Sequence, residues 1–305
     1  MLIGNQLSVK IKHKTLLDNI DFYVKPHEIV VIIGPNGAGK SSLMKALSGD
    51  LPLSGGTINI NQRELNEYSL LELAKLRAVL TQSYELDFPF TVNEVVDMAH
   101  FSHQEQCTQA TLKQCSNDAM KAVGITHLAQ QCFTQLSGGE KQRTQLARVL
   151  CQLQPSLTQQ KNAYLLIDEP TASLDLYHQY EVMNQAVTTA KQGAGVVAVL
   201  HDLSLAASFA DRIYMLDKGK VVAHGSPEEV LTQRHLSNVY NINAKLQTDI
   251  EDVLPHIMVA EKHSQIYDFK LYRLHIIECF YKGVTRACLS FEVKFAAVCL
   301  VFRQG

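Results

Sequence analysis

The stretch Gly34-Pro35-Asn36-Gly37-Ala38-Gly39-Lys40-Ser41 decides the fold of this chain. It follows an apolar, β-branched run, residues 29–33, which predicts a buried strand, and it precedes residues 42–47, which predict a helix. A strand, a glycine-rich turn and a helix together are the setting in which the pattern G-x-x-x-x-G-K-[ST] marks a phosphate site. The alternative is an ordinary turn with a chance Gly-Lys-Ser, and the flanking strand and helix disfavour it.

Each residue type in this stretch suits a bound phosphate. The glycines let the backbone curl so that several N–H groups point at one anion, and the following helix adds the positive end of its dipole. Lys40 can reach the β- and γ-phosphates of a nucleotide, and the Ser41 hydroxyl is a hard oxygen ligand suited to Mg²⁺.

The composition describes an ordinary globular protein. The chain has 305 residues, of which 46% are hydrophobic and 19% charged, enough for one large domain or two modest ones. A net charge of −2 gives no bulk attraction to nucleic acid or anionic lipid. The seven cysteines include no C-x-x-C pair, so we expect a reducing compartment with neither a disulfide framework nor structural zinc.

Metal-binding and membrane-spanning patterns are weak. Most of the twelve histidines are isolated, and we expect even His100 and His103, one helical turn apart, to be structural. The N-terminus lacks a basic-then-apolar signal pattern, and the apolar run Phe295 to Phe302 is too short to cross a bilayer. Any membrane role is therefore expected to come through a partner.

Strands alternate with helices along most of the chain, which predicts a mostly parallel sheet covered by helices, an α/β fold. Residues 10–14 are expected to form a basic loop between two N-terminal strands. We interpret residues 83–150 as a helical insert within the α/β core. The expected strands are 2–9, 20–24, 29–33, 57–60, 78–80, 164–167, 196–200, 212–216 and 221–223, and the expected helices are 42–47, 70–76, 92–101, 111–123, 137–150, 176–191 and 203–210, with a short one after Ser226.

The segment Leu136-Ser137-Gly138-Gly139-Glu140 predicts a second anion-binding helix end. Ser137 and Glu140 have the spacing of a capping box, so a helix should begin here and run through Leu150. A first turn of Ser-Gly-Gly presents bare N–H donors with little side-chain bulk. A well-capped helix without any ligand is an equally good interpretation of this segment alone.

Polar side chains follow two predicted buried strands. Asp168 and Glu169 come directly after residues 164–167, and His201 follows residues 196–200. In an open α/β sheet, ligands gather at the carboxyl ends of the strands. The two carboxylates fit a metal-holding acid and a water-orienting base, and the histidine can contact a phosphate or the attacking water. The alternatives are a solvated loop and a structural histidine.

Taken together, the motifs resemble those of ATP-binding cassette (ABC) ATPases. The phosphate loop, Gln82, residues 136–140, Asp168-Glu169, Ser173-Leu174-Asp175 and His201 occur in the family's order and look like its Walker A, Q-loop, signature, Walker B, D-loop and H-loop. The resemblance covers about residues 1 to 240. It implies a P-loop ABC cassette over residues 1–243, with a parallel core, an antiparallel β part and the helical subdomain 83–150, and leaves 244–305 as a C-terminal tail.

The resemblance also implies roles for individual residues. Two cassettes would pair head to tail and hold ATP between the phosphate loop of one chain and Ser137, Gly138, Gly139 and Glu140 of the other. Glu169 would polarise the attacking water, and His201 would hold the γ-phosphate. Gln82 would link the nucleotide to the helical insert, which in importers docks on a membrane permease. The implied nucleotide-binding residues of the first chain are Gly34, Pro35, Asn36, Gly37, Ala38, Gly39, Lys40, Ser41, Ser42 and Asp168, and Ser41, Gln82 and Asp168 are the implied Mg²⁺ ligands.

Three segments, residues 87–92, 173–179 and 199–203, resemble the haemin-import ATP-binding proteins of bacteria. Ferric-siderophore and cobalamin import ATPases are close relatives of these. The resemblance implies a homodimer of cassettes on the cytoplasmic face of the inner membrane. Its implied partners are a permease dimer and, indirectly, a periplasmic substrate-binding protein, with no nucleic acid.

Two departures and two alternatives accompany this interpretation. Where many cassettes place an aromatic residue that stacks on adenine, this chain has residues 10–13, so Ile11 or His13 must serve. The tail does not extend the family pattern.

A soluble cassette ATPase acting on DNA or ribosomes would need a second cassette or a long coiled coil, and the chain has neither. A regulatory module without turnover is disfavoured because Glu169 and His201 are both present.

Overall fold

The structure, a computed structural model, describes residues 1–81, 86, 88–169, 176–241, 243–247 and 256–260. These residues belong to one compact unit, Met1–Ala260. The short strands β11 (Asn243–Gln247) and β12 (His256–Ala260) pair with each other within that unit, beyond the predicted domain boundary at residue 243. That boundary and the nature of the tail stay predictions.

A six-stranded sheet forms the centre of this unit, with the strand order β10-β9-β3-β8-β7-β6. Strands β9, β3, β8, β7 and β6 run parallel, and β10 pairs antiparallel with β9. The mostly parallel α/β core predicted from the sequence is therefore confirmed. The strands are β3 (Ile29–Ile33), β6 (Arg77–Leu80), β7 (Tyr164–Asp168), β8 (Gly195–Val199), β9 (Arg212–Asp217) and β10 (Lys220–Gly225).

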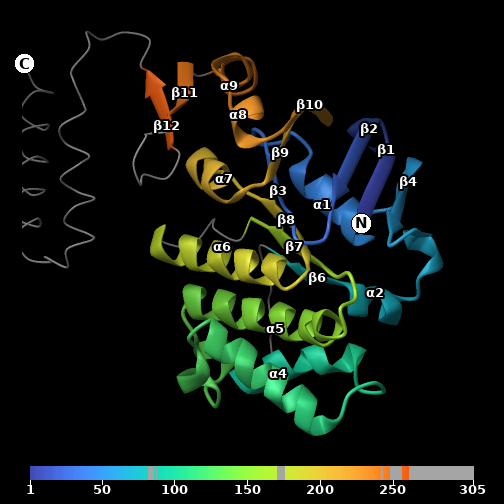
Figure 1. Cartoon of the computed structure of the whole chain (residues 1–305), viewed down its shortest axis with the longest axis vertical. Coiled ribbons are helices and arrows are strands. Elements are labelled where there is room, and N and C mark those ends of the chain that lie inside the picture. Colours follow the sequence, from blue (N-terminus) through green and yellow to red (C-terminus); the bar gives the residue numbers. More distant parts are fainter. Residues whose placement is uncertain (82–85, 87, 170–175, 242, 248–255, 261–305) are drawn as a thin grey trace, which may run out of the picture. The chain divides into compact units, whose positions relative to one another are not determined.

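The central strands are buried on both faces because their alternate side chains enter two separate cores. In β3, Val31 and Ile33 enter a core made with helices, whereas Val30 and Ile32 enter a core made with α1 and a second sheet. Figure 1 shows α4, α5 and α6 side by side on one side of the sheet, with α1 toward β1 and β2. The helices are α1 (Lys40–Ser48), α3 (Val92–Asp97), α4 (Gln109–Ala122), α5 (Gly138–Thr158), α6 (Leu176–Lys191) and α7 (Leu203–Phe209).

The second sheet is antiparallel and has the strand order β2-β1-β4-β5. The predicted loop at residues 10–14 is wrong, because Lys10 pairs with Thr15 and Ile11 with Lys14. The hairpin closes instead through the two residues Lys12 and His13, and Lys12 takes a left-handed φ of 53°. The strands are β1 (Leu2–Ile11), β2 (Lys14–Val24), β4 (Gly55–Ile60) and β5 (Arg63–Glu64).

The predicted helical insert contains α3, α4 and the first part of α5. Capping boxes formed by Thr91 with Glu94 and by Ser137 with Glu140 begin α3 and α5, and the second of these is the one predicted above. Helix α5 continues past Leu150, through Pro155, to Thr158. Its buried Leu153 and Leu157 keep the helical apolar spacing, which holds the helix together across a residue that lacks an N–H.

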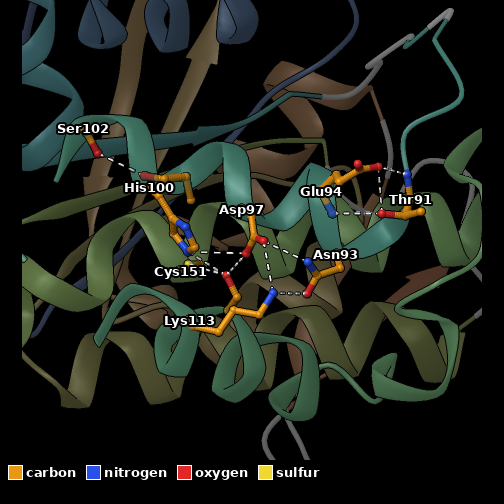
Figure 2. Close-up of polar contacts among 10 residues, drawn as sticks. Thr91, Asn93, Glu94, Asp97, His100, Ser102, Lys113 and Cys151 are labelled. Carbon is orange, nitrogen blue, oxygen red and sulfur yellow. Dashed lines mark hydrogen bonds and ion pairs between the residues drawn. The ribbon is translucent and has the colours of Figure 1, made fainter. Parts of the chain in front are cut away.

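A polar network links three helical elements of this insert (Figure 2). Asp97 accepts hydrogen bonds from Ser116 Oγ at 2.5 Å and from Asn93 Nδ2 at 2.8 Å, and the Lys113 ammonium lies 3.4 Å from it. His100 Nε2 lies 2.7 Å from Ser116 Oγ. The network therefore ties α3 and the 3₁₀ segment after it to α4, and His100 has a structural partner as predicted.

The remaining described helices are short, and of these α2 packs against β6 and α8 against β9 and β10. Among the described residues, no helix combines the length and the apolar character that a membrane span requires. These elements are α2 (Leu70–Leu76), α8 (Pro227–Val230), α9 (Gln233–Tyr240) and the 3₁₀ helices Leu65–Glu67, Met98–Ser102, Thr126–Leu128 and Phe133–Gln135.

Candidate functional site: a phosphate-binding loop

The glycine-rich loop between β3 and α1 can be built only with glycine at two of its positions. Gly34 has a φ of 150°, and a Cβ there would lie 2.3 Å from the Leu216 carbonyl oxygen. Gly39 caps α1 with a φ of 106°, and a Cβ there would lie 2.9 Å from the Leu16 carbonyl oxygen. The strand-loop-helix predicted from the sequence is confirmed, and its backbone packs closely against two neighbouring segments.

Lys40, the first residue of α1, is held within the loop. Its ammonium donates hydrogen bonds to the carbonyl oxygens of Gly34 at 2.9 Å and Pro35 at 3.2 Å. An ammonium has three donors, so two carbonyls leave one for a ligand. Burial lowers the pKa of Lys40, and the negative charges of Glu169 and Asp168 act in the opposite direction.

The loop opens into a pocket of about 470 Å³. The predicted residues Asn36, Gly37, Gly39, Lys40, Ser41, Ser42 and Glu169 line it. Gly34 and Pro35 contribute through their bonds to Lys40, and Ala38 is buried behind the loop with its N–H bonded to the Pro35 carbonyl. The other lining residues are Lys14, Thr15, Leu16, Lys218 and Gly219.

Asp168 ends β7 with an unsatisfied carboxylate oxygen. Asp168 Oδ1 is buried, and it has no hydrogen-bond partner within the part of the chain that the structure describes. Burial, and then the neighbouring Glu169 charge, raises the pKa of Asp168, whereas Lys45, Lys40 and His201 act against that rise. A buried acceptor without a donor fits a position where a cation binds.

Glu169 and His201 contact each other across the carboxyl ends of two neighbouring strands. Glu169 follows β7 with a left-handed φ of 49°, and its Oε1 lies 2.7 Å from His201 Nε2. His201 stands between the end of β8 and Asp202, whose side chain caps α7 by accepting from the N–H groups of Ser204 and Leu205. The geometry thus brings together the two side chains that the sequence predicted for the same edge.

Ser137 to Glu140 lie at the start of α5. Ser137 accepts a hydrogen bond from the Glu140 N–H, and the Glu140 carboxylate accepts from the Ser137 N–H and hydroxyl. These bonds to Ser137 lower the pKa of Glu140. Residues 137–140 are not among the described residues that line the pocket, so the chain does not bring this helix end to its own phosphate loop. Gln82 and Ser173-Leu174-Asp175 lie outside the described residues.

The sequence interpretation missed the wall formed by Lys14–Leu16 and by Lys218-Gly219. Lys14 was expected to end the loop at residues 10–14, and neither segment was given a role in the site. No local pattern could reveal this wall, because a backbone hydrogen bond from the Asp18 N–H to the Gly219 carbonyl joins two segments that are far apart in the sequence. Neither Ile11 nor His13 is among the described lining residues.

The phosphate loop, the carboxylates after β7 and the sheet topology define a P-loop nucleotide-binding cassette. The family model for ABC transporters matches residues 17–172, and the chain belongs to the ABC transporter family. This confirms the family and the fold inferred from the motifs.

Similar proteins agree with that membership. The chain is 62% identical over 260 residues to a hemin import ATP-binding protein of Pseudoalteromonas translucida, covering 85% of this chain and 100% of the relative. It is 43% identical over 256 residues to a protein of the same name from Hahella chejuensis, covering 84% of this chain and 96% of that one. A dimeric structure of a bacterial ABC transporter cassette matches with a TM-score of 0.65 and 25% identity, over 74% of this chain and 99% of that cassette.

Proposed function

We propose that this chain is the ATP-hydrolysing subunit of a bacterial haemin importer. The observation that carries the proposal is the 62% identity to a hemin import ATP-binding protein along that relative's whole length. The pocket supplies the chemistry that such a subunit needs, because the phosphate loop and the Glu169 carboxylate line it and His201 contacts that carboxylate.

The phosphate loop binds the triphosphate. The loop N–H groups and the start of α1 provide donors and a positive dipole end, and the free donor of Lys40 reaches the β- and γ-phosphates. Because phosphoryl transfer needs little covalent chemistry from a protein, the rate gain comes from positioning and charge stabilisation.

The residues present fit a magnesium ion. Ser41 offers a hydroxyl in the pocket, and Asp168 offers a buried oxygen without a partner among the described residues. Mg²⁺ prefers one or two such oxygens together with waters and substrate phosphates. Ser41, Asp168 and Gln82 would hold the ion, which neutralises charge on the phosphates when bound.

Glu169 and His201 act on the γ-phosphate side. Glu169 orients and polarises the attacking water, and His201 holds the γ-phosphate. The two side chains contact each other at 2.7 Å, so each helps to hold the other in position on this side of the site.

Completion of the site requires a second copy. The capped end of α5 with Ser137 would cover the nucleotide in the phosphate loop of the other chain, and ATP closes the dimer because it contacts both halves. The dimer would work on the cytoplasmic face of the inner membrane, bound through its helical subdomain to a permease dimer that a periplasmic binding protein loads.

The test is transport by the complex. The chain is purified with the permease that associates with it and placed in vesicles, and uptake of haem, ferric siderophore and cobalamin is compared. ATP-driven uptake of haem is expected. Uptake of either of the other two cargoes in place of haem would overturn the proposal.

A further inference from the structure

One wall of the nucleotide pocket, next to the phosphate loop, carries two lysines that none of the motifs explains. Lys14 begins β2, and Lys218 stands in the turn between β9 and β10. Both side chains are exposed at the pocket, together with Thr15, Leu16 and Gly219. The two segments are some 200 residues apart in the chain.

Backbone hydrogen bonds fix this wall against the phosphate loop. The Gly219 N–H donates to the Ala38 carbonyl at 2.8 Å, and the Gly219 carbonyl accepts from the Asp18 N–H at 2.8 Å. A Cβ on Gly219, whose φ is 79°, would lie 2.6 Å from the Leu16 carbonyl oxygen. Lys218 is therefore anchored to the loop and to β2 by its neighbour, and it cannot drift away from the pocket without breaking these bonds.

The charges of the two lysines are free to meet a ligand. Within the described residues, neither Lys14 nor Lys218 forms an ion pair. Lys220, two residues after Lys218 and outside the pocket lining, pairs with Asp18 at 3.2 Å. Among the residues that the structure describes, the charge of Lys220 is therefore compensated, whereas that of Lys218 is available to a phosphate bound in the pocket.

The described lining also contains no aromatic ring on which a base could stack. Charge and the aliphatic stems of the lysines must then replace part of the stacking energy at this end of the nucleotide. In the proposed site, Glu169 and Lys40 lie on the side of the γ- and β-phosphates. The α-phosphate and the ribose are then left for the wall that carries Lys14 and Lys218.

We propose that Lys14 and Lys218 form a clamp on the α-phosphate end of the bound nucleotide. This inference rests on the proposed ATP site and adds two affinity-determining residues to it. Because the contact does not involve the γ-phosphate, it strengthens binding of ATP and ADP equally. An ammonium contacting a phosphate in a partly open pocket accounts for about three- to tenfold in affinity.

Calorimetric titration of the full chain with Mg-ATP and Mg-ADP tests the clamp. Lys218→Ala and Lys14→Ala are each expected to weaken the affinity for both nucleotides by about three- to tenfold. Lys218→Arg is expected to retain most of the affinity because it keeps the charge, and Lys220→Ala is expected to leave the affinity unchanged. The weakening should shrink at high salt. Unchanged affinity in Lys218→Ala and Lys14→Ala, or a loss confined to ATP, would overturn the clamp.

Two controls distinguish loss of the clamp from misfolding of a variant and from failure of the nucleotide site itself. Thermal unfolding without nucleotide checks that each variant is folded, and Lys218→Arg keeps the charge should the alanine variant fold poorly. Lys40→Met, measured in parallel, reports on the phosphate loop itself. If Lys40→Met weakens binding and Lys218→Ala does not, the clamp alone fails; if neither weakens it, the nucleotide site fails.

Discussion

Glu169 Oε1 and His201 Nε2 lie 2.7 Å apart, although 32 residues separate them in the chain. Adjacent parallel strands β7 and β8 end beside each other, and each delivers one of the two side chains to the same edge of the sheet. Of the two, Glu169 is the more enclosed, with 15% of its side chain exposed against 43% for His201. The histidine therefore orients a carboxylate that already faces the pocket.

Replacement of Glu169 tests its role as the base. The glutamine of Glu169→Gln keeps the shape of the side chain, and its amide oxygen can still accept a hydrogen bond from His201, but it cannot take a proton from water. We expect ATP turnover to fall by about 10²- to 10⁴-fold, with ATP affinity retained, in a steady-state phosphate-release assay combined with nucleotide titration. Turnover by Glu169→Gln within about threefold of that of the unsubstituted protein would show that Glu169 is not the base.

Asp168→Asn is expected to stabilise the metal-free fold while it stops hydrolysis. Because burial raises the pKa of Asp168, its charged form costs free energy in the folded state. The neutral amide of asparagine removes this cost at pH 7. Thermal unfolding in EDTA should show the gain, and a phosphate-release assay with Mg²⁺ should show the loss of activity.

The pH dependence checks the sign of this effect. An acid whose folded pKa is raised carries its full penalty above that pKa, and the penalty fades as pH falls toward the unfolded value. The stability difference between Asp168→Asn and the unsubstituted chain should therefore shrink as the pH is lowered through this window. A difference that grows on acidification would contradict the assignment.

Lys40→Met is expected to weaken nucleotide binding without unfolding the chain. The substitution loses a charge-assisted phosphate contact, which corresponds to about a 10- to 150-fold weaker affinity. The midpoint of thermal unfolding should change little, because the lost bonds to Gly34 and Pro35 are offset by relief from burying a charge. Lys121→Met, an exposed position on α4, is the control, and equal affinities for both variants would count against the loop.

Asp97→Ala should destabilise the helical insert. Asp97 accepts hydrogen bonds from the fully buried Ser116 and from Asn93 and pairs with Lys113, and its loss removes all three of these interactions (Figure 2). We expect the free energy of unfolding to fall by about 2 kcal/mol in urea titration. Asp118→Ala removes an exposed carboxylate from α4, the helix that carries Ser116, and should cost less than about 0.5 kcal/mol. Similar losses in the two variants would show that the network adds nothing.

The part of the site that could be predicted from the sequence is the part encoded locally. The phosphate loop, the caps at Thr91 and Ser137, and the carboxylates after β7 each follow from residues within one short stretch. The shared edge of β7 and β8 followed from a general rule for parallel sheets.

The remainder depended on pairing between distant segments. The β1–β2 hairpin extended its register through Lys10 and Lys14, which shortened a predicted loop to two residues. Packing of Leu153 and Leu157 carried α5 beyond Leu150 and through a proline. Lys218 lies at the pocket because the Gly219 N–H donates a hydrogen bond to the phosphate loop, and the sequence of residues 217–220 does not predict that contact.

The proposed function requires that ATP is held between two copies of this chain, one contributing the phosphate loop and the other Ser137. Analytical ultracentrifugation of Glu169→Gln with Mg-ATP tests it most directly, with Glu169→Gln/Ser137→Arg sedimented beside it. We predict the mass of two chains for the first protein and of one chain for the second, although both bind ATP. A single-chain mass for ATP-saturated Glu169→Gln, or a dimer that Ser137→Arg leaves intact, would contradict the claim.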